Sequence, residues 1–257
     1  MTQPRSGSSL LAGILHHLGV YMGEEEELQK GKHKNKLGSF EDHRFLAIHH
    51  NILFKAKRLM YYFNRFSDED GRVEAAVKEY EEELKEYIEE NEREFWGFKE
   101  AVVIYTIPYF EHLLKDPHYI VLHRDAESVA NSQARAGKFR NWPSEIKQEF
   151  SYFTPKKRFL LFLRTIKTTF TKGFVYRSRK FIIRLTLDAQ ERIKQFVKNR
   201  KYIVIELPEI IEKPEESVEK IIKFLNMKPT KEQIKNALEF IRPELITSEI
   251  KNENKKP

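Results

Sequence analysis

Apolar residues recur along this chain with two different periods, and these periods predict helices alternating with strands. Residues 10–18 place leucine and isoleucine three or four positions apart, and a glycine follows at position 19. That spacing is typical of a helix that buries one face and ends at glycine. The same period predicts a second helix over about residues 41–64.

A third helical stretch is rich in charge and follows the turn sequence SDEDG. Apolar side chains repeat along it every three or four residues: Val73, Val77, Tyr80, Leu84 and Tyr87. Such a stripe occurs both in coiled coils and in helices that lie across a domain. The stripe is short for a coiled coil, which favours packing within the same chain.

Two short runs of β-branched and aromatic residues predict buried parallel strands. They are HYIVLH at residues 118–123 and KYIVIEL at residues 201–207. Each precedes a helical pattern, at 125–136 after the first run and at 215–225 after the second. Strands that alternate with helices in this way indicate an α/β fold, in which helices cover a parallel sheet.

One domain is the simplest organisation for this chain. It has 257 residues, no internal repeat and no sequence that separates two halves. We expect a single domain over residues 1–247 and a disordered polar tail over residues 248–257. The charged, glycine-containing stretch 24–39 predicts a mobile loop.

Composition narrows the possible chemistry. The chain contains no cysteine, which excludes disulfides and thiolate catalysis and favours a cytoplasmic location. No apolar run is as long as a membrane span, and no signal-peptide pattern opens the sequence. The net charge of +7 favours an anionic ligand or surface. Nucleic acid is not the expected partner, because no zinc-ligand spacing or RNA-binding aromatic motif accompanies that charge. No metal site is expected either, because adjacent histidines diverge on a helix.

The chain opens with a turn of small residues, PRSGSS at residues 4–9, that leads into the first helix. Such a turn lets backbone N–H groups converge on an oxyanion at the positive end of the helix. Hydroxyl donors come from Ser6, Ser8 and Ser9, and Arg5 adds a permanent charge. The lysine of a Walker A loop is absent, which counts against ATP or GTP hydrolysis. Taken alone, this stretch fits an ordinary serine-capped helix start about as well.

A second polar cluster follows the first predicted strand. Arg124 lies just beyond the carboxyl end of that strand, where ligands bind in open α/β sheets. Asp125 suits the N-cap of the next helix. Ser132 falls two turns into that helix, so Arg124 and Ser132 could hold one phosphate together. On its own, the stretch fits better an arginine paired with an acid and a serine exposed to water.

Together these clusters resemble the superfamily of sulfotransferases that use 3'-phosphoadenylyl sulfate (PAPS). In that family a Pro-Arg/Lys-Ser-Gly-Thr/Ser loop holds the 5'-phosphosulfate, and a strand-end arginine with a serine eight residues later holds the 3'-phosphate. The residues that match the family's loop here are Arg5, Ser6, Gly7, Ser8 and Ser9. The residues that match its 3'-phosphate site are Arg124 and Ser132.

Further stretches resemble the carbohydrate-type and bacterial members of that superfamily: LGVYMG and LGSFEDHRF at 18–23 and 37–45, WGFKE at 96–100, and the stretch 204–227. The resemblance implies a P-loop-like three-layer fold, in which helices flank a central parallel sheet. The family's loop follows a buried strand, whereas only three residues precede Pro4 here. We therefore expect that the first strand is short or missing, or that the chain begins downstream of its natural start.

The resemblance also implies an activity. The enzyme would move the sulfuryl group of PAPS to a hydroxyl acceptor without a metal and release the desulfo product, 3',5'-ADP (PAP). The acceptor would be a small molecule, a glycan or a lipid-linked group rather than a protein. Arg5 would stabilise the charge that develops on the leaving phosphate, and Lys99 would face the sulfuryl group. The alternatives are a non-catalytic protein that binds PAP or another nucleotide, and a kinase-like phosphotransferase.

A hydroxyl acceptor needs a general base, and the resemblance offers two glutamates. Glu41 lies between Phe40 and Phe45, whose rings would shield its carboxylate from water. Glu25, in the run of four glutamates, is the alternative with the spacing of the tyrosyl-type enzymes. We choose Glu41, although an acid beside a helix start and a solvated charge run are ordinary explanations for the two residues.

A basic and aromatic stretch covers residues 156–184. No acid occurs between Glu149 and Asp188, while ten residues are basic: Lys156, Lys157, Arg158, Arg164, Lys167, Lys172, Arg177, Arg179, Lys180 and Arg184. Aromatic residues accompany them: Phe153, Phe159, Phe162, Phe170, Phe174, Tyr176 and Phe181. The stretch fits two amphipathic helices with solvated charges, and it fits equally a lid for an anionic acceptor or a peripheral contact with an anionic membrane.

Overall fold

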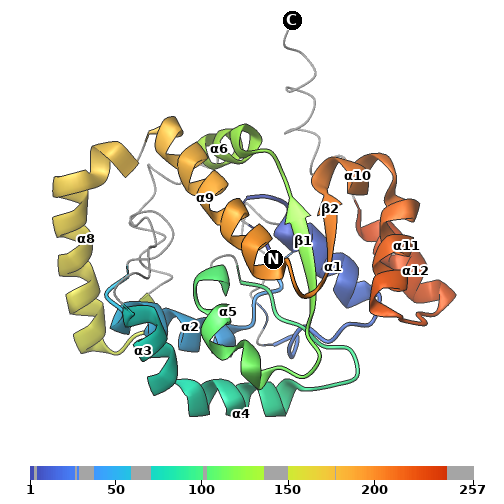
Figure 1. Ribbon diagram of the computed structural model, residues 1–257, viewed down its shortest axis with the longest axis horizontal. Helices are drawn as coiled ribbons and strands as arrows, with labels where there is room; N and C mark the ends of the chain where they lie inside the picture. Colours follow the sequence, from blue (N-terminus) through green and yellow to red (C-terminus); the bar gives the residue numbers. More distant parts are fainter. Residues whose placement is uncertain are drawn as a thin grey trace, which may run out of the picture.

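The computed structural model describes residues 1–2, 5–26, 28, 38–58, 71–100, 103–135, 150–176 and 178–241. Within these ranges the chain is α/β, mostly helical, with a two-stranded parallel sheet (Figure 1). The predicted tail at 248–257 and most of the predicted loop at 24–39 lie outside the described residues.

Both predicted strands are present, but the predicted burial is wrong for the second of them, where Tyr202 and Val204 are 43% and 39% exposed. Strand β1 (His118–His123) pairs in parallel with β2 (Lys201–Glu206), with His118 opposite Lys201 and His123 opposite Glu206. Parallel strands need a crossover, and the described helices along this one are α6 (Ala126–Arg135), α8 (Pro155–Tyr176) and α9 (Arg179–Val197). Since the strands are in register, both carboxyl ends meet at one edge of the sheet.

The two faces of β1 pack into different apolar clusters. Tyr119 belongs to one cluster, whereas Ile120 and Leu122 belong to the other, as the alternation of side chains along a strand requires. Helices that build the first cluster with α9 are α2 (His43–Lys55), α3 (Arg72–Glu79), α4 (Glu81–Asn91) and α5 (Ile107–Phe110). Those that build the second are α1 (Ser8–His17), α10 (Leu207–Glu212), α11 (Pro214–Leu225) and α12 (Lys231–Phe240). Two 3-10 turns, η1 (Val103–Tyr105) and η2 (Glu111–Leu113), flank α5.

The sheet is smaller than the resemblance implies. Among the described residues, the position of the first strand is represented by Met1, whose amine donates to the Ile120 carbonyl and whose carbonyl accepts from Leu122 N at 3.0 Å. The WGFKE stretch forms one parallel bridge, between Trp96 and Tyr21, and no longer strand. The described chain therefore fits the coarse α/β class, with two strands in place of a wider central sheet.

The second predicted helix is shorter than expected. Helix α2 begins after Asp42, whose carboxylate accepts from Phe45 N at 2.8 Å, and it ends at Lys55. Lys57 has a φ of 57°, and Arg58 N donates back to the Leu53 carbonyl at 2.9 Å. This is the left-handed C-terminal motif that stops a helix. The remainder of the predicted helix, from residue 59, lies outside the described residues.

The long charged helix is in fact two helices. Tyr80, with φ −104° and ψ 13°, separates α3 from α4. The predicted stripe is nevertheless buried, since Val73, Val77, Leu84 and Tyr87 are each at most 2% exposed. These side chains pack with α2 in the first cluster, as expected for helices that lie across a domain.

Two adjacent histidines of α2 are buried in the core. His50 is 4% exposed, its ring centroid lies 4.5 Å from that of Tyr152, and neither of its ring nitrogens has a hydrogen-bond partner. Burial, with a smaller contribution from His49, holds the pKa of His50 well below the ordinary value of 6.5. The imidazole is therefore neutral in the folded protein at pH 7.

This burial predicts a pH dependence of stability. Because the folded-state pKa of His50 lies below its unfolded-state pKa, the unfolded chain binds more protons below pH 6.5, and stability falls as the pH falls. His50→Phe should flatten this dependence by about 1.4 kcal/mol per pH unit in the acidic range. Urea unfolding between pH 5 and 7 measures it. The exposed His43 is a control, since His43→Phe should keep the wild-type slope. A wild-type slope in His50→Phe would mean that water solvates this ring.

Candidate functional site

The turn before α1 is built around Gly7. Its φ of 91° and ψ of 13° are left-handed, and it is the N-cap of α1 without any side-chain hydrogen bond to the helix start. An added Cβ would lie 2.6 Å from Leu207 Cδ1, so the loop packs too closely against α10 for another residue. The N-cap of α1 is therefore a glycine and not one of the serines of this loop.

The serines of the turn have different surroundings. Ser6 is 2% exposed, and its hydroxyl shares a hydrogen bond with the Thr2 hydroxyl. Ser8 and Ser9 lie in the first turn of α1 and are half-buried. The buried Ser6 therefore holds the loop to Thr2, while Ser8 and Ser9 lie at the positive end of the helix.

The two predicted phosphate sites meet in the fold. Arg124 leaves the carboxyl end of β1, and its Nη1 donates to the Arg5 carbonyl at 3.1 Å. Arg5 Nε in turn donates to Ser132 Oγ at 3.3 Å. Arg124 and Ser132 are 5% and 1% exposed, so Ser132 is not a solvated surface serine. The fold thus places Arg5 beside Arg124 and Ser132, which lie far from it along the chain.

Local contacts fix the position of Arg124. Asp125 caps α6 as predicted, since its Oδ1 accepts from Ser128 N at 2.8 Å. Gln190 of α9 donates from Nε2 to the Arg124 carbonyl at 2.8 Å. The turn between β1 and α6 is therefore held from both sides, and the guanidinium starts from a rigid backbone.

Glu41 and Lys99 form an ion pair. Lys99 Nζ lies 2.5 Å from Glu41 Oε1 and donates to the Ser39 carbonyl at 3.1 Å. Both side chains are mostly buried, at 13% and 16% exposure for Lys99 and Glu41. Glu25, the alternative base, lies in an exposed turn. The structure thus brings together two of the three predicted catalytic side chains, Glu41 and Lys99, and the third, Arg5, lies in the loop before α1.

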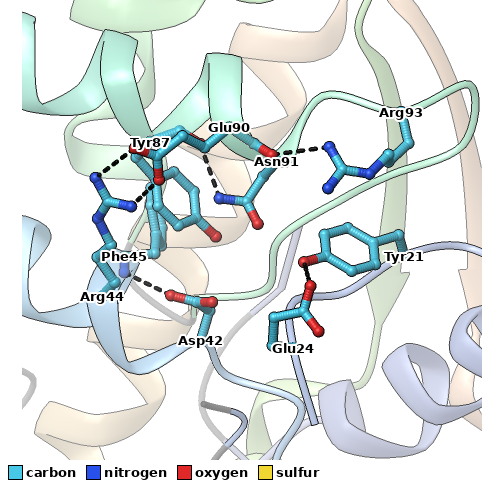
Figure 2. Close-up of polar contacts among 9 residues, drawn as sticks. All are labelled: Tyr21, Glu24, Asp42, Arg44, Phe45, Tyr87, Glu90, Asn91 and Arg93. Atoms are coloured by element: carbon cyan, nitrogen blue, oxygen red, sulfur yellow. Dashed lines mark hydrogen bonds and ion pairs between the residues drawn. The ribbon is translucent and has the colours of Figure 1, made fainter. Parts of the chain in front are cut away.

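Polar contacts join the start of α2, next to Glu41 along the chain, to the end of α4 (Figure 2). Asp42, next to Glu41, caps α2. Arg44 of α2 pairs with Glu90 of α4, and Arg93 donates from Nη1 to the Glu90 carbonyl at 2.8 Å. These contacts connect the start of α2 to the end of α4, from which the chain continues to Lys99.

A buried polar cluster lies next to Lys99 along the chain, and the sequence did not reveal it. Glu100 is 3% exposed, and its Oε2 lies 3.3 Å from Nδ1 of the buried His49. The other ring nitrogen of His49, Nε2, lies 2.8 Å from Thr106 Oγ1. Burial lowers the pKa of His49 to about 3, so its ring is neutral at pH 7. The one signal for this cluster was polar side chains at positions where the pattern calls for apolar ones.

A cavity of about 490 Å³ connects the loop with Lys99. Its wall includes Thr2 and Ser8 from the N-terminal segment and residues 92–100 on the opposite side. Ser8 and Lys99 therefore border one space, whereas none of Arg5, Arg124 and Ser132 is among its lining residues.

A second titratable pair at the sheet edge was also missed. His123 Nδ1 lies 2.7 Å from Glu206 Oε2, and both side chains are about two-fifths exposed. They are the last residues of β1 and β2, so the parallel register places them opposite each other. Their common position at predicted strand ends was the signal that could have identified them.

Two features are absent from the described ranges. There, no group of three or more His, Asp or Glu side chains is placed to hold a metal ion. No helix in the same ranges is both long and apolar enough to cross a bilayer.

Comparison of the chain with protein-family models, curated proteins and solved structures found no match.

Proposed function

We propose that this chain is a PAPS-dependent sulfotransferase that transfers a sulfuryl group to a hydroxyl acceptor and releases PAP. One observation carries the proposal: Arg124 and Ser132 contact Arg5, in the loop that begins α1. Two arginines with hydroxyl donors, next to a helix start whose N-cap is a glycine, form a set of donors suited to phosphate oxygens. The proposal includes the fold that the resemblance implies, a P-loop-like fold with a central parallel sheet wider than the two described strands.

Each residue has a role in holding the cosubstrate. The N–H groups of the loop, the hydroxyls of Ser8 and Ser9 and the Arg5 guanidinium would hold the 5'-phosphosulfate. Arg124 and Ser132 would hold the 3'-phosphate. Their burial favours this arrangement, because hydrogen bonds to an anion are strongest where water is excluded.

When the sulfuryl group of PAPS is transferred, the bond to the 5'-phosphate breaks and PAP is the leaving group. Arg5 would stabilise the charge on that phosphate. Glu41 would accept the proton of the acceptor hydroxyl, and Lys99, which pairs with Glu41, would face the sulfuryl group.

Two other functions compete with this one. A kinase-like phosphotransferase is disfavoured because the loop has no Walker lysine. A non-catalytic protein that binds PAP or another nucleotide would use the same phosphate contacts and leave Glu41 and Lys99 without a chemical task.

Arg124 should be the main contact of the 3'-phosphate. A charged, bidentate hydrogen bond contributes roughly 1.5–3 kcal/mol and a neutral hydroxyl about 1 kcal/mol. Arg124→Ala should therefore weaken PAP binding more than Ser132→Ala does. Calorimetry with 5'-AMP, which lacks the 3'-phosphate, is the control, because neither change should alter its affinity. An equal loss for AMP and PAP in Arg124→Ala would withdraw the assignment.

Glu41→Gln should slow turnover, measured by sulfuryl transfer from radiolabelled PAPS, and leave PAP affinity nearly unchanged. A base acts on the acceptor rather than on the cosubstrate, so kcat falls without a change in PAP binding. Glu25→Gln is the matched control and should turn over normally. Loss of turnover in Glu25→Gln alone would move the base to the loop. Normal turnover in both variants would remove carboxylate base catalysis from the proposal.

We also propose that α8 contacts an anionic membrane surface from the cytoplasmic side. Apolar side chains of this helix are exposed, Phe159 by 63%, Phe162 by 42% and Leu163 by 46%. Lys156 and Lys167 are exposed on the same helix, which lies at the edge of the molecule away from the sheet (Figure 1). Exposed aromatic residues beside lysines are typical of helices that bind in the membrane interface. A lid over an anionic acceptor would use the same residues.

The double change Phe159→Ser and Phe162→Ser should abolish cosedimentation with phosphatidylserine vesicles. The double change Lys156→Glu and Lys167→Glu should weaken vesicle binding most at low salt, because at high salt the ions already screen the attraction between the lysines and the anionic surface. Leu187→Ser is the control, since Leu187 is 53% exposed but lies on α9. A raised acceptor KM without any change in vesicle binding would favour the acceptor lid instead. If neither vesicle binding nor the acceptor KM changes, the remaining explanation is that the charges of these helices are simply solvated.

A further inference from the structure

The carboxyl edge of the sheet carries an imidazole–carboxylate pair that has no role in the proposed reaction. His123 Nδ1 lies 2.7 Å from Glu206 Oε2, and each side chain is about two-fifths exposed. The two residues end β1 and β2 and lie opposite each other in the register. Ligands of open α/β sheets bind at this edge. The pair is therefore accessible to a ligand that also contacts the residue after β1.

The pair lies on the face of the sheet that α9 covers. Side chains alternate along a strand, so His123 shares its face with Tyr119 and Val121, which pack in the cluster that α9 helps to build. Ile205, the neighbour of Glu206, belongs to the other cluster. Helix α6 continues from the end of β1 and packs against α9 (Figure 1). The pair and the proposed 3'-phosphate site, which α6 helps to form, thus share one corner of the molecule.

The ring of His123 is held so that one nitrogen stays available. Nδ1 is directed at the Glu206 carboxylate, and Glu206 belongs to the capping box at the start of α10. In the uncharged ring, a carboxylate acceptor at Nδ1 fixes the tautomer that carries the proton there. The other nitrogen, Nε2, makes no hydrogen bond to any residue of the described ranges. Nε2 is then an acceptor at a fixed position, and it matches a ligand group that donates.

Charge decides which ligand group fits. The Glu206 carboxylate repels a second phosphate at this position, whereas a ribose hydroxyl can donate to Nε2 without adding charge. An acidic residue holds the ribose 2'-hydroxyl in the same way in dinucleotide-binding α/β folds. In PAP the 2'-hydroxyl is next to the 3'-phosphate on the ribose. His123 is likewise next to Arg124 on the chain.

We propose that His123, oriented by Glu206, accepts a hydrogen bond from the 2'-hydroxyl of PAPS and PAP, and that Glu206 disfavours a 2'-phosphate. The pair would make the site specific for a 3'-phosphorylated ribonucleotide. This inference rests on the proposed binding of PAP by Arg124 and Ser132.

Calorimetry with PAP and with 2'-deoxyadenosine 3',5'-bisphosphate tests the hydrogen bond. The wild-type chain should bind PAP about fivefold more tightly, the factor that one net hydrogen bond contributes. His123→Phe keeps a planar ring and removes both nitrogens, so it should abolish this preference by weakening PAP alone. His118→Phe is the matched control, because it makes the same change at the exposed opposite end of β1. It should keep the preference.

Adenosine 2',5'-bisphosphate tests the role of the charge. Glu206→Gln removes the negative charge and keeps an oxygen that can accept from His123 Nδ1. It should strengthen binding of this compound by about threefold at low salt and change PAP affinity little. Glu212→Gln removes an exposed charge from the far end of α10 and should change neither affinity. Unchanged binding of the 2',5'-bisphosphate in Glu206→Gln would remove the role of Glu206 in excluding it.

Two outcomes separate this inference from the proposed function. Equal affinity of the wild-type chain for PAP and the 2'-deoxy compound, or a preference that persists in His123→Phe, would overturn the inference and leave the proposed function standing. If PAP binds no more tightly than 5'-AMP, the 3'-phosphate site and this inference are both wrong. If His123→Phe does not fold, nitrogen NMR of the wild-type histidine rings decides. The Nε2 signal of His123 should then shift with PAP and not with the 2'-deoxy compound, and equal shifts would overturn the inference.

Discussion

The parallel pairing of β1 with β2 determines where the polar groups of the candidate site lie. Because the strands run in the same direction and in register, both carboxyl ends point to one edge. Arg124 follows β1 at that edge, and α10, against which Gly7 packs, follows β2. The hydrogen bond from Arg124 to the Arg5 carbonyl then joins the sheet edge to the loop. Loss of this register would separate the two halves of the site.

Buried polar groups impose the second constraint. His49, Glu100 and Thr106 are buried beside the apolar cluster of α2, and His49 contacts both of the others, Thr106 at 2.8 Å and Glu100 at 3.3 Å. Glu100 follows Lys99 directly, so this cluster restricts the backbone that carries the Lys99–Glu41 pair. Rigidity at the candidate catalytic side chains thus comes from the core beneath them and from the capped start of α2.

Much of this arrangement could be predicted from sequence, for physical reasons. The strands at 118–123 and 201–206 were evident because β-branched and aromatic residues run through both, and Asp125 was evident as a cap because its side chain accepts locally. The break at Tyr80 could not be predicted, since the apolar period continues across it. The contact of Arg5 with Ser132 and the pairs His49–Glu100 and His123–Glu206 depend on tertiary packing. The described residues form two strands, and the wider sheet, which was inferred from the resemblance, stays a proposal.

The account depends most directly on what the Arg5 loop and the Arg124–Ser132 pair bind together. Calorimetric titration of the purified chain with PAP and with ATP, each with and without magnesium, tests it. Two separate phosphate sites and a loop without the Walker lysine predict that PAP binds far more tightly than ATP and that magnesium has no effect. Equal affinity for ATP, together with a dependence on magnesium, would contradict the account.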